Sequence, residues 1–166
     1  IKGGKVVVRT AEEGSKFTTL DGVERTLSAE DLMICNAEEP MCIGGVFGGL
    51  DSGVTEETKN IFIESAYFNP VSIRKTARRH GLNTDASFRF ERGIDPHNTI
   101  YILKYAAMLI KELTGGTIAS EVTDIYPTPL NNFIVDVKIE KINSLIGKVI
   151  ETEQIERIFE GLEMKV

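Results

Sequence analysis

A single carboxylate stands inside one of the most apolar stretches of the sequence. Glu64 lies within residues 60–68, a run of β-branched and aromatic residues that predicts a buried strand. Strand alternation places Glu64 on one face with Phe62 and Ala66, and the other face is also apolar, which disfavours exposure. A carboxylate in such surroundings costs free energy unless it has a partner. Two interpretations stay open: an ion pair with a nearby arginine, or an acceptor for a polar group of a ligand.

A predicted helix directly after this run gathers basic side chains. Asn69 caps free backbone amides, Pro70 fits a first helical turn, and Gly81 is a favoured left-handed end. Ile73 and Ala77 share the apolar face. Four basic residues share another face: Arg74, Lys75, Arg78 and Arg79. We expect this face to bind the phosphates of a partner.

The charge of the chain is unevenly distributed. The net charge is −6, whereas residues 74–92 contain six basic and two acidic residues, which is +4 and leaves −10 for the remainder. An acidic body argues against a protein that coats nucleic acid indiscriminately. A concentrated positive patch instead suits one phosphate-bearing partner.

Two further motifs each allow a structural and a functional interpretation. Residues 84–87, Thr-Asp-Ala-Ser, form either a helix N-cap or turn cluster, or the wall of a shallow pocket beside the basic helix. The glycine-dense residues 44–53 form either a tight turn or a close backbone approach to a ligand. This loop lacks the Lys-Ser/Thr and the strand-to-helix GxGxxG context of a nucleotide cradle.

No pair of residues suggests a nucleophile with its base, so we expect no catalytic nucleophile. His80 and His97 are the only histidines, and neither stands near a Ser or Cys at a diagnostic spacing. Cys35 and Cys42 lack the spacing of metal ligands, so we expect no metal and two small buried residues on neighbouring strands. If the chain hydrolyses anything, it must therefore use positioned water, electrostatics or the substrate's own groups.

The whole pattern predicts an α+β (mixed α/β) fold, a β-sheet with the basic helix and a long central helix. Strands are predicted at residues 5–10, 16–20, 23–27, 31–36, 41–46, 60–68 and 117–126. The central helix, residues 96–114, is expected to lie against the sheet and to end at Gly115. Residues 1–127 would form this domain.

A second, truncated domain is expected after a linker at residues 128–132. Residues 133–139 predict a strand, and residues 140–146 and 152–162 predict two short amphipathic helices. Residues 133–166 are too few for a self-sufficient core. Because the sequence opens on Ile1 rather than Met, we expect a segment of a longer chain.

Composition narrows the class of protein further. With 42% hydrophobic and 27% charged residues, the chain is typical of a globular protein. No apolar run approaches the ~20 residues that span a bilayer, and no secretory signal is visible. We expect a cytoplasmic protein without a membrane partner.

One long motif is similar to a known family. Residues 74–96 read Arg-Lys-Thr-Ala-Arg-Arg-His-Gly-Leu-Asn-Thr-Asp-Ala-Ser-Phe-Arg-Phe-Glu-Arg-Gly-Ile-Asp-Pro, which resembles the β subunits of bacterial phenylalanyl-tRNA synthetases. Residues 44–53 and 61–70 also fit at matching spacing, and residues 135–165 look like the start of a small winged-helix-like domain. The resemblance implies most of an editing domain, which hydrolyses tyrosine esterified to tRNA(Phe).

The resemblance also implies an editing pocket made of Gly48, Glu64, Thr84 and Ala86. In the family the glutamate reads the tyrosine hydroxyl, and the other three shape the pocket wall. A further histidine of the family, in a His-Ala-Phe-Asp-like segment, falls just before Ile1, and an upstream arginine is likewise absent. We therefore expect the site in this chain to be incomplete.

The partners implied by the resemblance are tRNA(Phe), tyrosine as the edited amino acid, and the synthetase α subunit in an (αβ)₂ assembly. The basic face of residues 74–79 (Arg74, Lys75, Arg78 and Arg79) would then hold the phosphates at the 3′ end of the tRNA. ATP and Mg would serve the parent ligase, and no cofactor is expected within this chain. The alternative is a module that binds tRNA or an aromatic amino acid without hydrolysis. DNA binding by residues 140–162 is disfavoured, because that span shows no basic recognition face.

Overall fold

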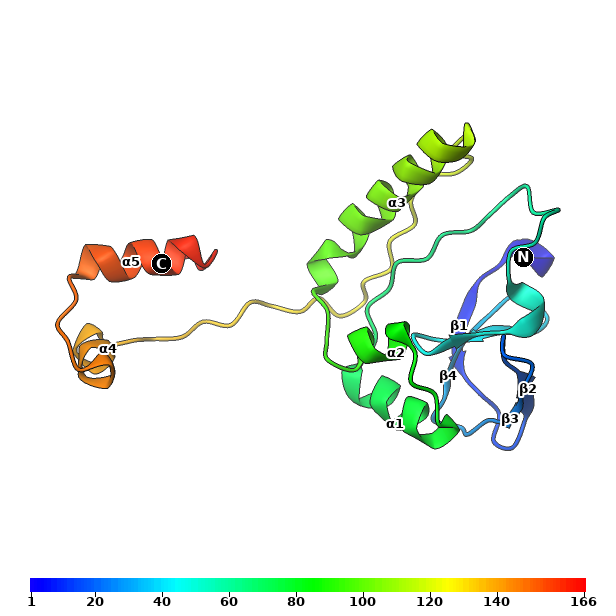
Figure 1. The fold of residues 1–166 in the computed structure, drawn as a ribbon, viewed down its shortest axis with the longest axis horizontal. Coiled ribbons are helices and arrows are strands. Elements are labelled where there is room, and N and C mark those ends of the chain that lie inside the picture. Colours follow the sequence, from blue (N-terminus) through cyan, green and yellow to red (C-terminus); the bar gives the residue numbers. More distant parts are fainter. The chain divides into compact units, whose positions relative to one another are not determined.

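The computed structural model describes residues 1–166, which divide into two compact units, Ile1–Ile125 and Tyr126–Val166. Helices and antiparallel strands occur together, so the predicted α+β fold class is confirmed (Figure 1). None of the helices combines the length and apolar character needed to cross a membrane.

A four-stranded antiparallel sheet lies at the centre of the first unit. Its strands, in spatial order, are β1 (Val7–Thr10), β4 (Leu32–Cys35), β5 (Pro40–Ile43) and β6 (Phe47–Gly48). The register aligns Ile34 with Cys42, and Cys42 with Gly48. Residues in one such row face the same side of a sheet. The row therefore places Gly48 and Cys42 side by side on one face.

A separate hairpin joins β2 (Lys16–Thr18) to β3 (Glu24–Thr26) through a turn that contains Asp21 and Gly22. A bridge between Thr19 and Gly49 connects this hairpin to the main sheet. Gly49 is held closely, since an added Cβ would come within 2.6 Å of both the Met41 carbonyl oxygen and the Phe17 ring. Single 3₁₀ turns lie at Lys2–Gly4 (η1) and Leu50–Ser52 (η2).

The two helices that follow are fixed by their caps. In α1 (Pro70–His80) the Asn69 side chain accepts hydrogen bonds from two backbone amides, and Gly81 ends the helix with φ +63°. Both boundaries are those predicted from the sequence. The short α2 (Asp85–Phe90) begins at Thr84, whose side chain forms a capping box with Ser87.

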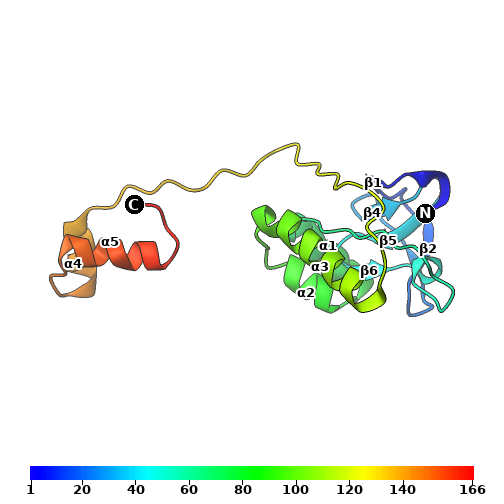
Figure 2. The ribbon, with the colours of Figure 1, turned by 90° about the horizontal axis from the view of Figure 1, so that it is seen from above.

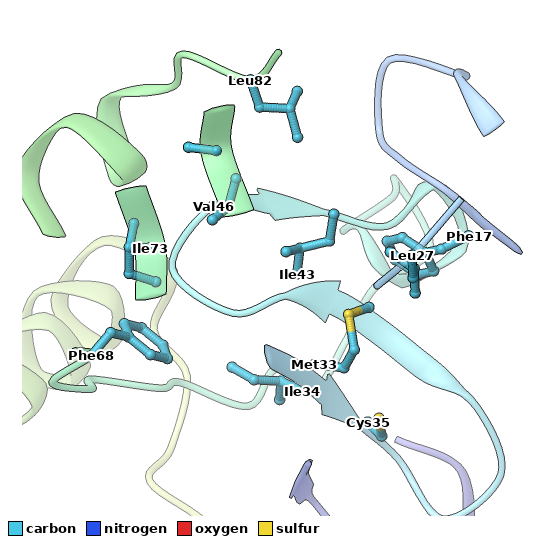
Figure 3. Close-up of a cluster of buried hydrophobic side chains, with 11 residues drawn as sticks. Phe17, Leu27, Met33, Ile34, Cys35, Ile43, Val46, Phe68, Ile73 and Leu82 are labelled. Carbon is cyan, nitrogen blue, oxygen red and sulfur yellow. The ribbon is translucent and has the colours of Figure 1, made fainter. Parts of the chain in front are cut away.

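The hydrophobic core lies between the sheet and α1 (Figure 3). Its buried members are Phe17, Leu27, Met33, Ile34, Cys35, Ile43, Val46, Phe68, Ile73, Ala77 and Leu82. Gly45 permits this close packing, because a Cβ there would come within 2.8 Å of Ile73 and Phe68, and its φ of +68° favours glycine. Phe68 also contacts Phe90 edge-to-face, with ring centroids 4.8 Å apart, which joins α2 to the core.

Two predicted strands of this unit are wrong. Residues 60–68 and 117–126 form no strand, although their composition favours one. A strand requires a neighbour to complete its backbone hydrogen bonds, and neither segment pairs with β1 or β6, the edges of the sheet. Composition alone therefore did not determine the structure of these segments.

The expected central helix forms, but not in the expected setting. Residues 96–114 comprise a 3₁₀ turn, η3 (Pro96–Asn98), and α3 (Thr99–Thr114), which ends at Gly115 in the left-handed region as predicted. No residue of α3 is buried, so the prediction that it lies against the sheet is wrong. That prediction depended on the two segments that do not form strands, which would have extended the sheet.

The second unit contains two helices, α4 (Ile139–Ile146) and α5 (Thr152–Gly161), as predicted. The Asn143 side chain bonds to both backbone groups of Ile150 and so fixes the turn between them. The predicted strand at residues 133–139 is wrong, since Phe133 is 98% exposed and unpaired, and α4 already begins at Ile139. Ile155 is the only buried residue of this unit. Figure 2 shows the two helices from a second direction.

Candidate functional site

A cavity of about 940 Å³ lies within the first unit, beside β5 and β6. Its lining comes from the sheet, from residues 64–68, from α2 and from the start of α3. All four residues of the predicted editing pocket line this cavity: Gly48, Glu64, Thr84 and Ala86. The structure thus brings together residues that lie up to 38 positions apart in the sequence.

The sheet side of the cavity is small and apolar. Ile34, Cys42 and Gly48 occupy the row across β4, β5 and β6, and all three line the cavity. An added Cβ on Gly48 would meet no atom within 4 Å, so a side chain there would fit locally but would occupy cavity space. Glycine at this position keeps the cavity open.

Glu64 lies in a different environment from the buried strand predicted by the sequence. It is not buried in a strand, and it forms no ion pair or side-chain hydrogen bond, so the arginine-paired interpretation is wrong. Glu64 is exposed, yet the surrounding protein removes enough water from its carboxylate to raise the pKa of that group. The cavity therefore contains a hydrogen-bond acceptor with no protein partner.

The two cysteines lie on neighbouring strands, as predicted. Cys35 is 1% exposed, whereas Cys42 is half-buried and lines the cavity. Burial, and then the negative charge of Glu64, raise the pKa of the Cys42 thiol to about 11. This thiol is protonated at neutral pH and acts as a small apolar group.

Thr84 is both a helix cap and part of the cavity wall, so its two interpretations are compatible. Its hydroxyl donates to the Val46 carbonyl oxygen at 2.7 Å and accepts from the Ser87 backbone amide at 3.0 Å. The first bond joins α2 to the loop before β6. Ala86 follows in the first turn of α2, which places it on the same wall.

Three of the four basic side chains on the predicted phosphate-binding face of α1 contact other protein groups. Lys75 lies 3.6 Å from Glu30, and Arg79 pairs with both Glu30 and Asp31. Arg74 donates to the backbone carbonyl of Glu91 at 3.1 Å. Arg78 has no partner, and none of the four predicted residues lines the cavity. Phosphate binding by this face remains a prediction.

Asp31 is the largest feature that sequence reasoning missed. Its carboxylate is 0% exposed and accepts hydrogen bonds from the Ser28 amide at 2.9 Å and from Thr76 Oγ1 at 3.0 Å. It also bonds to His80 Nε2 at 2.6 Å and to Arg79. The available signal was the helical spacing of residues 76, 79 and 80, which puts three polar side chains on one side of α1.

The described residues include no group of three or more His, Cys, Asp or Glu arranged to hold a metal ion. The cavity lining contains no histidine. Its lining combines apolar side chains with carboxylates, one guanidinium, and hydroxyl, amide and thiol groups.

Comparison with known proteins places the chain in a class. The B3/4 domain family matches residues 1–115, and the chain belongs to this family. Over its whole length of 166 residues, the chain is also 65% identical in sequence to the phenylalanine–tRNA ligase β subunit of Bacteroides fragilis. Identity is 55% to the β subunit of Porphyromonas gingivalis and 45% to that of Geobacter metallireducens, again across the whole chain. The chain spans about a fifth of the length of these relatives.

Proposed function

We propose that this chain is the editing region of a cytoplasmic phenylalanine–tRNA ligase β subunit, and that it takes part in hydrolysing tyrosine from tRNA(Phe). The parent enzyme would attach phenylalanine to that tRNA using ATP and Mg, in an (αβ)₂ assembly with the α subunit. One observation carries the proposal: Gly48, Glu64, Thr84 and Ala86 line one cavity, and the glutamate has no protein partner. Similarity to phenylalanine–tRNA ligase β subunits supports it.

The cavity suits discrimination by a hydroxyl group. An apolar pocket built for phenylalanine rejects an added hydroxyl by only about 10²-fold, so a ligase for phenylalanine mischarges with tyrosine. A second site that hydrogen-bonds the hydroxyl can discriminate by roughly 10⁴–10⁵-fold, because the substrate lacking it leaves a polar group unpaired. Glu64 is an acceptor of this kind, since its carboxylate is partly desolvated and unpaired.

Hydrolysis would proceed without a protein nucleophile. The cavity lining has no histidine to serve as a base for its hydroxyl groups, and the Thr84 hydroxyl is engaged by the backbone on both sides. Water would attack the ester carbonyl carbon, the bond to the ribose oxygen would break, and that oxygen would take up a proton. The role of the chain's own residues is then to hold the tyrosyl group and orient the ester toward water.

The test compares deacylation of tyrosyl-tRNA(Phe) and phenylalanyl-tRNA(Phe) by the complete protein that contains this chain. Glu64→Ala should lower the preference for the tyrosyl ester by roughly 10–100-fold, the range of a hydrogen bond to a charged group. Glu56→Ala is the matched control, because Glu56 is exposed and lies outside the cavity. Unchanged rates with both esters would refute the role of Glu64.

A second candidate is a module that binds tRNA or an aromatic amino acid without chemistry. The absence of a histidine, which could serve as the base for a hydroxyl or thiol nucleophile, from the cavity lining favours it. Calorimetry with tyrosine and phenylalanine, beside the deacylation assay, separates the two functions. Preferential binding of tyrosine with no ester cleavage by the complete protein would support the binding module.

A further inference from the structure

The cavity contains one cation that the predicted site did not include. Arg89 of α2 is the only basic residue in the lining, whereas the acidic residues there are Glu64, Asp85 and Asp95. Arg89 is exposed and forms no hydrogen bond or ion pair, even with Asp85 one helical turn away. A lone unpaired guanidinium in an otherwise acidic cavity is available to a ligand.

The other basic residues near α2 are engaged or lie elsewhere. Lys75 and Arg79 pair with acids, Arg74 bonds to a carbonyl oxygen, and Arg92 pairs with Glu91 at 3.0 Å and lies 3.5 Å from the centre of the Phe88 ring. Arg78 is free but lies outside the cavity lining. Arg89 therefore stands alone in being both unpaired and in the cavity.

The base of Arg89 is held in place by α2. Arg89 follows Ala86 by three positions, so both residues share one face of the helix. The Thr84 cap and the contact between Phe68 and Phe90 fix the two ends of this helix. Arg89 thus lies beside the wall of the proposed tyrosine pocket, at a position set by the fold.

We propose that Arg89 binds the phosphate that joins the terminal nucleoside of the bound tRNA to the rest of the strand. The inference rests on the proposed function. An amino acid esterified to tRNA has no free carboxylate, so the anion nearest the ester is this phosphate. A guanidinium donates two parallel hydrogen bonds to a phosphate, which positions the ligand as well as binding it.

The test uses a stable amide analogue of the substrate, 3′-tyrosylamino-3′-deoxyadenosine, with and without its 5′-phosphate. The complete protein should bind the phosphorylated analogue about tenfold more tightly or better, as a charge-assisted contact would give. Arg89→Gln should abolish this preference, and Arg89→Lys should keep part of it. Arg9→Gln is the matched control, because Arg9 is an exposed arginine on β1 without a partner, outside the cavity.

The outcomes separate this inference from the proposed function. A phosphate preference that survives in Arg89→Gln, or that is lost instead in Arg78→Gln, overturns the assignment of Arg89. Equal binding of both analogues by the unaltered protein also overturns it, while preference for tyrosyl over phenylalanyl analogues would still support the proposed function. If Arg89→Gln removes the phosphate preference but tyrosyl and phenylalanyl analogues bind equally, Arg89 is confirmed and tyrosine selection fails.

Discussion

Two carboxylates in different regions of the molecule, Asp31 at α1 and Glu64 in the cavity lining, have opposite environments. Asp31 is fully buried and surrounded by donors from the backbone, from Thr76, from Arg79 and from His80. Glu64 keeps contact with solvent and has no donor. Burial would raise the pKa of Asp31, but the hydrogen bonds from Ser28, His80 and Thr76 lower it overall. Desolvation raises the pKa of Glu64.

The difference shows how a structural carboxylate can be told from one available to a ligand. A buried carboxylate whose acceptor positions are all filled stabilises the fold and cannot accept a further hydrogen bond from a ligand. A partly desolvated carboxylate without partners is maintained at a cost in free energy. In this chain Lys75 and Arg79 of α1 pair with Glu30 and Asp31, whereas Glu64 has no basic partner.

The largest expected effect comes from removing the structural carboxylate. Asp31→Ala should lower the free energy of unfolding by about 3 kcal/mol, because it leaves the donors of α1 facing a buried void. Glu30→Ala is the matched control, since Glu30 pairs with the same Arg79 at a site that is 60% exposed, and it should cost less than about 1 kcal/mol. Urea denaturation followed by circular dichroism measures both. Equal losses of unfolding free energy in the two variants would contradict the view that the buried carboxylate stabilises the fold more than the exposed one.

A smaller effect should appear in the pH dependence of stability. The contribution of Asp31 is present above its usual pKa of 3.8 and is lost as pH falls through its lowered pKa. The contribution of Glu64 has the opposite sign: it is present below 4.5 and is lost as pH rises through its raised pKa. Asp31→Asn should therefore flatten the acid limb of the stability curve, and Glu64→Gln should flatten the decline above pH 4.5. Denaturation series from pH 3 to 7 test this, and a steeper acid limb in Asp31→Asn would contradict it.

The smallest effect concerns the thiol beside Glu64. Because the charge of Glu64 contributes to the raised pKa of Cys42, Glu64→Gln should speed alkylation of Cys42 by iodoacetamide at pH 8. The increase should stay below about tenfold, since burial is the larger cause and remains. Residue-resolved mass spectrometry separates Cys42 from the buried Cys35, and Glu56→Gln serves as the control. An unchanged alkylation rate would mean that the charge of Glu64 does not affect the pKa of the Cys42 thiol.

Helix boundaries were predictable because their signals are local. Asn69, Gly81 and Gly115 each act on backbone groups within one helical turn. The strands predicted at residues 60–68 and 117–126 failed because a strand depends on a partner that the segment itself does not encode. For the same reason the environment predicted for Glu64 was wrong.

The cavity was predictable only through family resemblance. Its residues belong to separate elements, and no local spacing connects Gly48 to Thr84. The Asp31 cluster could not be found in this way, because its partners on α1 lie 45 to 49 positions away along the chain. Arg89 was part of the recognised motif, but only the contacts of the neighbouring basic residues distinguish it from them.

The two hydrogen bonds of the Thr84 hydroxyl have a consequence for how this pocket can evolve. The same oxygen caps α2 and joins it to the loop before β6, so a substitution there alters the scaffold together with the wall. Glu64 carries no such structural duty and can be exchanged with little effect on the fold. Substitution of Glu64 can therefore change substrate preference while the fold is retained. Substitution of Thr84 changes the shape of the cavity and the position of α2 together.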